Sequence, residues 1–136
     1  MESAKIKKIG IEEIDKLQKI SQQTFFETFA EVNSEENMKE YLKNNFSVEK
    51  LSNQLTNPNS EFYFAIRGNE TLGYLKLNFR EEQTELKDKN GLEIERIYVL
   101  KEFQGSKIGQ LLYAKALEVA KKQDLNYLWL ALWFSS

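Results

Sequence analysis

The sequence predicts an α+β domain built on a mixed, mainly antiparallel sheet that is flanked by helices. Three observations lead to this prediction: helical patterns dominate the chain up to Asn57, a hairpin signal follows, and a strand–helix–strand pattern closes the sequence. Helices followed by a hairpin favour segregated α and β elements over a wholly parallel sheet. With 136 residues the chain is long enough for an independent core, so we expect one domain over residues 1–136.

The composition excludes several classes of function. The 19 basic and 21 acidic side chains give a formal charge of −2, without the basic stripe that nucleic-acid binding needs. The sequence contains no cysteine and no histidine, which removes disulfides, thiolate nucleophiles and the commonest metal ligands, so we expect no metal. No apolar run approaches the roughly 18 residues of a membrane span. The charged N-terminus lacks a signal-peptide core, so we expect a cytoplasmic protein without a membrane partner.

The first part of the chain predicts one short strand and then helices. Residues 4–9 are a plausible strand before Gly10. From Glu12 to about Ala30, apolar residues follow one face of a helix. Ser34 and Ser47 are good N-caps for two further helices, the second of which ends before the Asn-Pro-Asn sequence at 57–59.

The middle of the chain predicts a hairpin followed by a loop. Phe62 to Arg67 and Thr71 to Phe79 are typical of strands and lie on either side of Gly68-Asn69, a dipeptide that favours a tight turn. Residues 80–91 are polar, and we expect them to form a solvated loop.

A strand, a short loop and a helix are predicted over residues 92–120. Leu92 to Val99 is rich in β-branched and aromatic residues, as a strand requires. After the loop, apolar side chains recur at the spacing of one buried helix face: Leu112, Tyr113, Ala116, Leu117 and Ala120. Tyr127 to Phe134 is apolar on both strand faces, as expected of a central strand covered on each side.

The loop before this helix is a candidate anion site. Gly105 and Gly109 lie where the chain enters the helix, whose first backbone N–H groups lack partners within the helix. These donors and the positive end of the helix dipole favour a bound phosphate. Two glycines often mark only a tight turn, so the spacing alone leaves both interpretations open.

The spacing of Val99, Gln104 and Gly109 resembles the acetyl-CoA pyrophosphate loop of the GNAT superfamily of N-acetyltransferases. That loop usually reads Gln or Arg, two residues, Gly, one residue, then Gly or Ala, and here Lys107 stands where the first Gly belongs. The resemblance extends over the whole chain and is strongest to polyamine acetyltransferases of the PaiA type. Three stretches carry it: TFFETF (24–29), ENMKEYL (36–42) and LEIERIYV (92–99).

The resemblance implies a GNAT-like fold with acetyl-CoA as cosubstrate. Residues 97–99 would pair with the pantetheine arm like an added β-strand and supply a backbone N–H to the thioester carbonyl. Residues 104–110 would hold the pyrophosphate through main-chain donors, with Lys107 either contacting a phosphate or occupying a strained backbone position. The predicted cofactor-binding residues are Ile97, Tyr98, Val99, Gln104, Gly105, Ser106, Lys107, Ile108, Gly109 and Gln110.

Glu93 and Glu95 are the candidate catalytic residues. They lie two apart, so an ideal strand directs both to one face. The resemblance implies that a carboxylate at one of these positions deprotonates the amine, often through water, and we favour Glu95 over Glu93. The alternative is that one or both are solvated or pair with Arg96 or Lys101. We find no candidate for the proton donor to the leaving thiolate.

An acidic region of the first two helices bears on the acceptor. Five acids lie between residues 27 and 40: Glu27, Glu31, Glu35, Glu36 and Glu40. Acids near a cleft attract a cationic substrate, and the same pattern is equally typical of a solvated helix surface. With the resemblance, a polyamine such as spermidine or spermine becomes the leading acceptor, and Phe29, Glu27 and Glu31 the substrate-binding residues. Another small amine or a protein amine stays open, because the family shares one cofactor site among many acceptors.

The end of the chain leads to two further expectations. In the family that the chain resembles, the last strand continues into a helix and two more strands, so we expect a C-terminally incomplete domain that lacks them. The alternative function is a non-catalytic GNAT-fold protein that binds CoA weakly or acts by self-association. An uncharged strand with an open edge is a template for pairing, so we expect a homodimer or a higher homo-oligomer.

Overall fold

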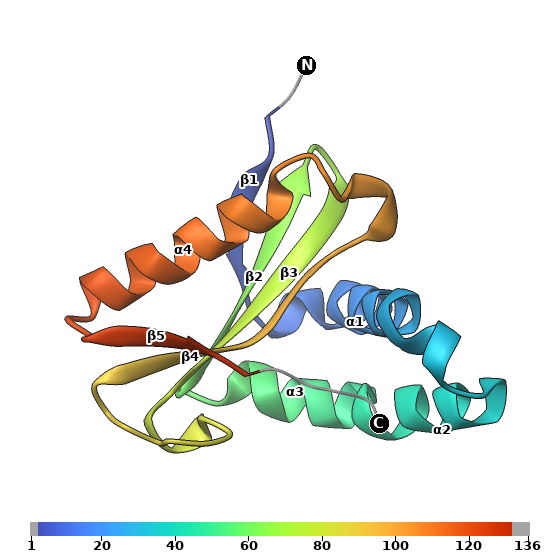
Figure 1. Cartoon of the computed structure of the whole chain (residues 1–136), viewed down its shortest axis with the longest axis horizontal. Helices are drawn as coiled ribbons and strands as arrows, with labels where there is room; N and C mark the ends of the chain where they lie inside the picture. The colour runs from blue at the N-terminus through green and yellow to red at the C-terminus, as the bar shows by residue number, and fades with distance from the viewer. Residues whose placement is uncertain (1–2, 132–136) are drawn as a thin grey trace.

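The computed structural model describes residues 3–131, which form a five-stranded sheet with helices on both faces (Figure 1). The strands are β1 (Lys5–Ile9), β2 (Ser60–Arg67), β3 (Glu70–Phe79), β4 (Gly91–Val99) and β5 (Tyr127–Leu130). Their order in the sheet is their order in the sequence. The three pairs β1–β2, β2–β3 and β3–β4 are antiparallel, and the pair β4–β5 is parallel. The predicted mixed, mainly antiparallel sheet is therefore confirmed.

Four α-helices and four single 3₁₀ turns accompany the sheet in the described residues. The helices are α1 (Ile14–Phe29), α2 (Glu35–Asn45), α3 (Val48–Thr56) and α4 (Ile108–Lys122). The 3₁₀ turns are η1 (Ile11–Glu13), η2 (Ala30–Val32), η3 (Arg80–Glu82) and η4 (Lys101–Phe103). Both predicted caps are confirmed, because the Ser34 and Ser47 hydroxyl oxygens accept hydrogen bonds from the first turns of α2 and α3, at 3.1 and 3.2 Å.

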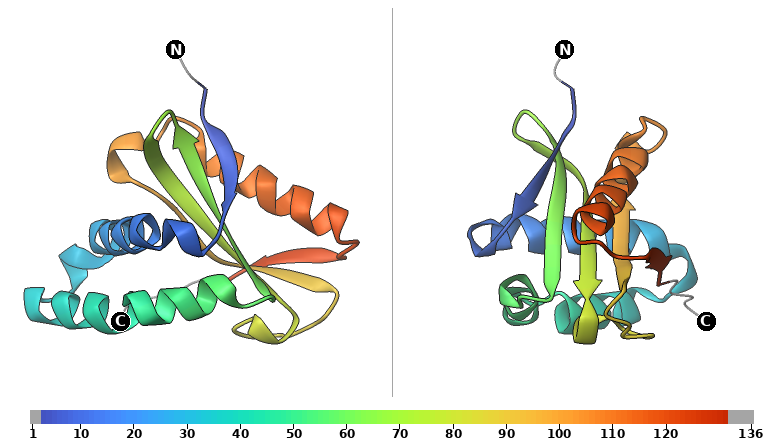
Figure 2. Two further views of the ribbon diagram at one scale, coloured as in Figure 1. Left: turned by 180° about the vertical axis from the view of Figure 1, so that it is seen from behind. Right: turned by 90° about the vertical axis from the view of Figure 1, so that its left-hand side faces the viewer.

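Each face of the sheet has its own hydrophobic core. Helix α4 covers one face, where Leu77 and Leu112 are fully buried. Helices α1 and α3 cover the other, where Leu17, Leu51 and Phe64 are fully buried. Figures 1 and 2 show these two helical layers on opposite sides of the strands. The sheet is thus a central layer whose strands can direct side chains into either half of the molecule.

The predicted buried face of α4 is partly wrong. Tyr113 and Leu117 are exposed, because a sheet buries only the side chains on the narrow face of a helix that contacts it. The buried positions are Ile108, Leu112, Ala116, Val119 and Ala120. None of the helices between residues 3 and 131 combines the length and the apolar composition needed to cross a membrane.

The loop between β3 and β4 is largely exposed, as its polar composition predicted, and Gln83 is its buried exception. Gln83 is fully buried, and its side-chain amide donates to the carbonyl oxygens of Arg80 at 3.1 Å and of Asp88 at 2.8 Å. Its side-chain oxygen accepts a hydrogen bond from the indole N–H of Trp129 at 2.7 Å. Gln83 therefore orders the loop and ties it to β5.

Strand β5 lies at an edge of the described sheet, which agrees with the open edge expected for it, although its apolar composition is typical of a central strand. It pairs with β4 alone, and Leu130 is 49% exposed. The remaining positions of the predicted strand, 132–134, lie outside the described residues.

Candidate active site

Strand β4 contains a bulge at its centre. The register between β3 and β4 shifts next to Lys76, which makes Glu95 an extra residue in β4. Two consecutive side chains, Glu95 and Arg96, consequently turn toward the face covered by α1 and α3. The Arg96 guanidinium lies over the Phe46 ring, 5.3 Å from its centre, and within 3.4 Å of the Glu95 carboxylate. The alternative that Glu95 pairs with Arg96 is therefore observed.

Glu95 is buried and surrounded by donors. Its Oε1 accepts hydrogen bonds from Lys76 Nζ at 2.5 Å and from Asn78 Nδ2 at 2.7 Å. Burial raises the pKa of Glu95, but the charges of Arg96 and Lys76 and these hydrogen bonds outweigh it and hold the pKa below its ordinary value. Glu95 is accordingly a fixed, ionised carboxylate. Its Oε2 has the Arg96 guanidinium, at 3.4 Å, as its neighbour.

Glu93 is fully buried beneath the loop between β3 and β4. Its Oε1 accepts hydrogen bonds from Asn78 Nδ2 at 2.9 Å and from the Thr84 backbone N–H at 2.8 Å, and its Oε2 accepts one from the Thr84 hydroxyl. Asn78 thus bridges Glu93 and Glu95, which share one face as expected. Both carboxylates have protein partners, but Glu93 is fully buried and Glu95 is 9% exposed, so the geometry favours Glu95 as the carboxylate that can reach a ligand.

Lys76 and Asn78 are site residues that sequence reasoning missed. Both belong to β3, whose other interior positions are mostly apolar, and both are buried. A lysine and an asparagine two apart in an otherwise apolar strand were the available signal, because buried polar groups need partners on a neighbouring strand. Nothing in the sequence indicates that these partners are Glu93 and Glu95.

The second half of β4 has no partner on its β5 side among the described residues. The ladder between the two strands runs from Gly91, opposite Tyr127, to Ile94, opposite Leu130. The following β4 residues, 96–99, pair with β3 alone. Within residues 3–131, this half of the strand therefore has an open edge.

The N–H groups of Ile97 and Val99 point to this open edge. The Leu100 N–H donates to the Leu72 carbonyl of β3 at 2.9 Å. In an antiparallel pair, residues alternate between exchanging hydrogen bonds with the partner and pointing away from it. Counting back from Leu100, the N–H groups of Val99 and Ile97 are those that point away from β3. The Val99 carbonyl, on the same edge, accepts a hydrogen bond from the Gln104 side chain at 3.3 Å.

The N-terminus of α4 presents a second set of free donors. Lys107 precedes the helix and its side chain does not cap it. Its φ of 67° is in the left-handed region, which is strained for a residue other than glycine, as one of the two predictions for Lys107 has it. The first bond of the helix is from Leu111 N–H to the Lys107 carbonyl at 3.2 Å, which leaves the N–H groups of residues 108–110 without helical partners. Gly105 has φ 87° and open space where a side chain would be. The Ser106 hydroxyl donates a hydrogen bond to the Phe103 carbonyl, so this side chain is used within the loop.

Glu27 connects α1 to the loop after β4. Its Oε1 accepts a hydrogen bond from the Lys101 backbone N–H at 2.9 Å, and its Oε2 accepts one from the Gln23 side chain at 3.0 Å. It lines a cavity of about 470 Å³ that α1 shares with this loop. Glu27 therefore ties the loop after β4 to α1.

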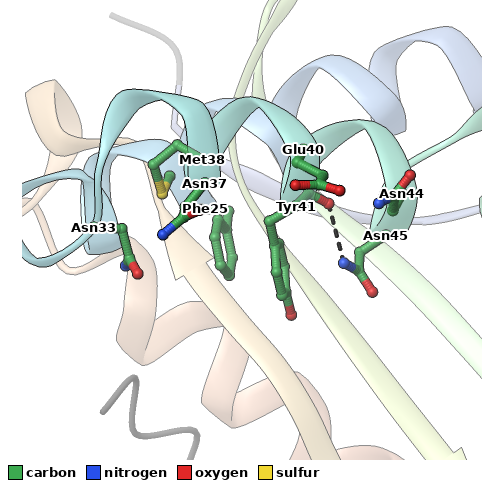
Figure 3. Close-up of a pocket in the computed structure, with 8 residues that line it drawn as sticks. All are labelled: Phe25, Asn33, Asn37, Met38, Glu40, Tyr41, Asn44 and Asn45. Carbon is green, nitrogen blue, oxygen red and sulfur yellow. Dashed lines mark hydrogen bonds between the residues drawn. The ribbon is translucent and has the colours of Figure 1, made fainter.

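A second cavity, of about 390 Å³, lies beside α2 (Figure 3). The rings of Phe25 and Tyr41 stack in its wall, with centres 4.4 Å apart. The Phe25 ring lies 5.5 Å from the Phe46 ring, and the Arg96 guanidinium of β4 lies 5.3 Å from the centre of that ring, so this wall is close to the second half of β4. The lining residues are Phe25, Asn33, Asn37, Met38, Glu40, Tyr41, Asn44 and Asn45.

The three predicted substrate-binding residues do not gather in one cavity. Phe29 is buried behind Phe25, with ring centres 4.5 Å apart. Glu31 is exposed in η2, and Glu27 lines the other cavity. Of the five acids between residues 27 and 40, Glu40 is the one that lines the cavity beside α2.

The sequence is similar to known acetyltransferases along most of its length. Residues 14–133 match the model of the Acetyltransferase (GNAT) family. The chain is 38% identical over 133 residues to a protein of Lactobacillus delbrueckii subsp. lactis named "Uncharacterized N-acetyltransferase in pepI 3′region", which covers 98% of this chain and 77% of that protein. It is 26% identical over 127 residues to the spermidine N(1)-acetyltransferase of Thermoplasma acidophilum, covering 90% and 74%.

Solved structures share the fold. The PaiA N-acetyltransferase from Thermoplasma acidophilum in complex with coenzyme A matches with a TM-score of 0.77 at 26% identity, over 90% of this chain and 75% of that chain. An aminoglycoside acetyltransferase, meta-AAC0020, from an uncultured soil metagenomic sample in complex with sisomicin matches with a TM-score of 0.71 at 16% identity, over 95% and 77%. The second match concerns the fold alone. The GNAT-like α+β fold expected from the sequence is confirmed.

Proposed function

Because the chain belongs to the acetyltransferase (GNAT) family of acetyl-CoA-dependent N-acetyltransferases, we propose that its acceptor is a polyamine such as spermidine or spermine. The observation that carries this proposal is the identity of 26% over 127 residues to the Thermoplasma spermidine N(1)-acetyltransferase. The acids between residues 27 and 40 support it, because an acceptor with several positive charges is drawn to carboxylates such as Glu31 in η2 and Glu40 in α2.

Two parts of the chain fit the chemistry of acetyl-CoA, which supplies the acetyl group as a thioester. The free N–H groups at the start of α4, with Lys107 beside them, suit a pyrophosphate. The open edge of β4 suits an extended arm that carries amide groups, because such an arm can pair with Ile97 and Val99 as a strand would. We propose the same cofactor-binding residues as before: Ile97, Tyr98, Val99, Gln104, Gly105, Ser106, Lys107, Ile108, Gly109 and Gln110.

Glu95 is the residue to which we assign proton removal from the acceptor amine. Lys76 and Asn78 occupy its Oε1, so we assign the proton to Oε2, which has the Arg96 guanidinium at 3.4 Å as its neighbour, directly or through one water. As the new C–N bond forms and the C–S bond breaks, a backbone N–H on the open edge of β4 donates to the oxygen on which negative charge develops. Glu93 stays a weaker candidate, because the protein already engages both its oxygens.

An acceptor panel tests this proposal. Thiol release from acetyl-CoA is measured with spermidine, spermine, simple monoamines, an aminoglycoside and a peptide N-terminus. We expect the highest kcat/KM for the polyamines. Turnover of the peptide or the aminoglycoside instead would overturn the polyamine assignment. Calorimetric binding of CoA without turnover of any acceptor would support the non-catalytic alternative.

We also propose that the chain forms a homodimer or higher oligomer through β5. Support comes from the apolar composition of this edge strand and from Leu130, which is 49% exposed. Leu130→Lys is expected to shift the sedimentation coefficient toward that of the monomer. The matched control is Leu86→Lys, at an exposed leucine of the loop between β3 and β4 (66% exposed), which should leave it unchanged. A wild-type chain that sediments as a monomer at high concentration contradicts the proposal.

A further inference from the structure

The cavity beside α2 has no part in the transfer step described above, although the contacts of Phe25 with Phe46 and of Phe46 with Arg96 connect its wall to the second half of β4. We propose that this cavity binds the distal ammonium group of the acceptor, the one that is not acetylated, and so selects polyamines over monoamines. This inference rests on the polyamine function proposed above. It assigns a binding site to Glu40, Asn33 and Asn45 and to the Phe25–Tyr41 wall.

The amides of the cavity present acceptors to a ligand. The Asn33 side-chain N–H donates to the Phe29 carbonyl at 3.0 Å. That of Asn45 donates to the Tyr41 carbonyl at 3.0 Å, the bond drawn as a dashed line in Figure 3. Each amide keeps a second N–H, and the side-chain oxygens of Asn33 and Asn45 remain available to accept a hydrogen bond. An amide oxygen only accepts hydrogen bonds, so the complementary ligand is a hydrogen-bond donor.

The charge and the rings of the cavity select a cation among such donors. Glu40 contributes a carboxylate, and no lysine or arginine is among the described residues that line the cavity. The stacked rings of Phe25 and Tyr41 add aromatic faces, which attract an ammonium group. An anionic ligand would meet the Glu40 charge without a compensating cation, so an ammonium fits better than a phosphate or a carboxylate.

A row of contacts connects the cavity to Glu95. The Phe25 ring lies 5.5 Å from the Phe46 ring, and Phe46 in turn lies under Arg96, the neighbour of Glu95. The cations beside Glu95, Lys76 and Arg96, repel a second positive charge at that point. A polyamine whose reacting nitrogen lies at Glu95 therefore gains by placing its other ammonium in the cavity, where a carboxylate and acceptor oxygens replace the two cations.

Glu40→Gln tests the inference by steady-state kinetics with spermidine and with propylamine, a monoamine without a distal charge. Loss of one charged hydrogen-bond partner is expected to lower the ratio of the two kcat/KM values, spermidine over propylamine, by about tenfold, mainly through the KM for spermidine. Asn44→Asp, which adds a carboxylate to the cavity lining, is expected to raise the same ratio. Glu49→Gln makes the same charge change on the exposed surface of α3 and should leave the ratio unaltered.

The outcomes separate the two proposals. An unaltered ratio in Glu40→Gln, with spermidine still acetylated, overturns the cavity assignment and leaves the polyamine function standing. An equal loss with spermidine and propylamine overturns it as well, because a site for a distal ammonium cannot affect a monoamine in this way. A wild-type enzyme that does not acetylate spermidine overturns both. Because Glu40 is exposed, its replacement is not expected to disturb folding, which the thermal midpoint of each variant checks.

Discussion

The two halves of strand β4 differ in how their polar groups are used. The first half, Gly91–Ile94, pairs with a strand on each side, and its carboxylate, Glu93, is fully buried with both oxygens hydrogen-bonded. The second half, Arg96–Val99, pairs only with β3 in the described part of the chain and is half-buried. The bulge at Glu95 separates the two.

The difference shows why one strand can serve both the fold and the chemistry. Backbone and side-chain groups that bond within the protein stabilise it but have nothing left to offer a ligand. The open edge of the second half keeps its donors free, and the satisfied first half holds that edge in place. Glu95 stands between the two conditions, since Lys76 and Asn78 hold its Oε1 while Oε2 has only the Arg96 guanidinium, at 3.4 Å, beside it.

The largest expected effect comes from Glu95→Gln. Removing the general base should lower turnover by roughly 10²–10⁴-fold while the CoA affinity measured by calorimetry stays nearly the same. Glu93→Gln is the matched control on the first half of the strand, and we expect it to affect the free energy of unfolding more than turnover. If Glu93→Gln alone abolishes turnover, the roles of the two carboxylates are reversed.

Lys76→Met should destabilise the protein strongly. It leaves the buried Glu95 carboxylate without its closest cation, a change that typically costs about 3–5 kcal/mol in free energy of unfolding. Lys8→Met removes an exposed lysine that pairs with Glu61 at 3.3 Å, and this should cost about 1 kcal/mol or less. Urea denaturation of both variants compares the two directly. Similar losses would show that the Lys76–Glu95 pair behaves like a surface ion pair.

The acid side of the stability curve should carry the signature of Glu95. Its pKa is lowered in the folded protein, so its contribution to stability is present above the unfolded pKa of about 4.3 and is lost as pH falls through the folded value. The free energy of unfolding of the wild type should therefore drop more steeply below about pH 4 than that of Glu95→Gln. Parallel curves for the two proteins would mean that the Glu95 pKa is not lowered by folding.

The smallest expected effect is at Lys107. A non-glycine residue at its φ of 67° costs on the order of 1 kcal/mol, so Lys107→Gly should stabilise the fold by about that amount and tighten CoA binding. Lys107→Ala keeps the strain and removes the charge, so it should weaken CoA binding, with a loss that shrinks at high salt. Weaker CoA binding in Lys107→Gly would show that the lysine charge contributes more than the strain costs.

Features that depend on neighbours in sequence could be predicted. Ser34 and Ser47 cap their helices, and Gly68, with φ 61°, turns the hairpin, because each of these effects acts within a few residues. The α+β class followed from the order of such local elements. The family resemblance added Glu95 and the loop before α4, and the strained backbone at Lys107 was one of the two readings considered for that position.

Features that depend on strand register and distant contacts could not be predicted. Arg96 shares a face with Lys76 and Glu95 only because the register of β3 and β4 shifts beside Lys76, which reverses the alternation of side chains beyond that point. Gln83 bonds to Trp129, 46 positions away, so its polar surroundings in sequence indicated the opposite environment. The edge position of β5 likewise depends on which elements lie beside it, which its own apolar composition does not report.

The alternating N–H directions of β4 also set how fast its amides exchange with deuterium. The Leu100 amide bonds to β3 and should be protected, whereas the neighbouring Val99 amide, which points to the open edge, should exchange early. Ile97 should follow Val99, so labelled and unlabelled sites alternate along a single strand. A ligand that pairs with the edge would slow Val99 and Ile97 and leave Leu100 as it was. Deuterium exchange at these three amides therefore shows whether a ligand occupies the open edge of β4, without any assay of acetyl transfer.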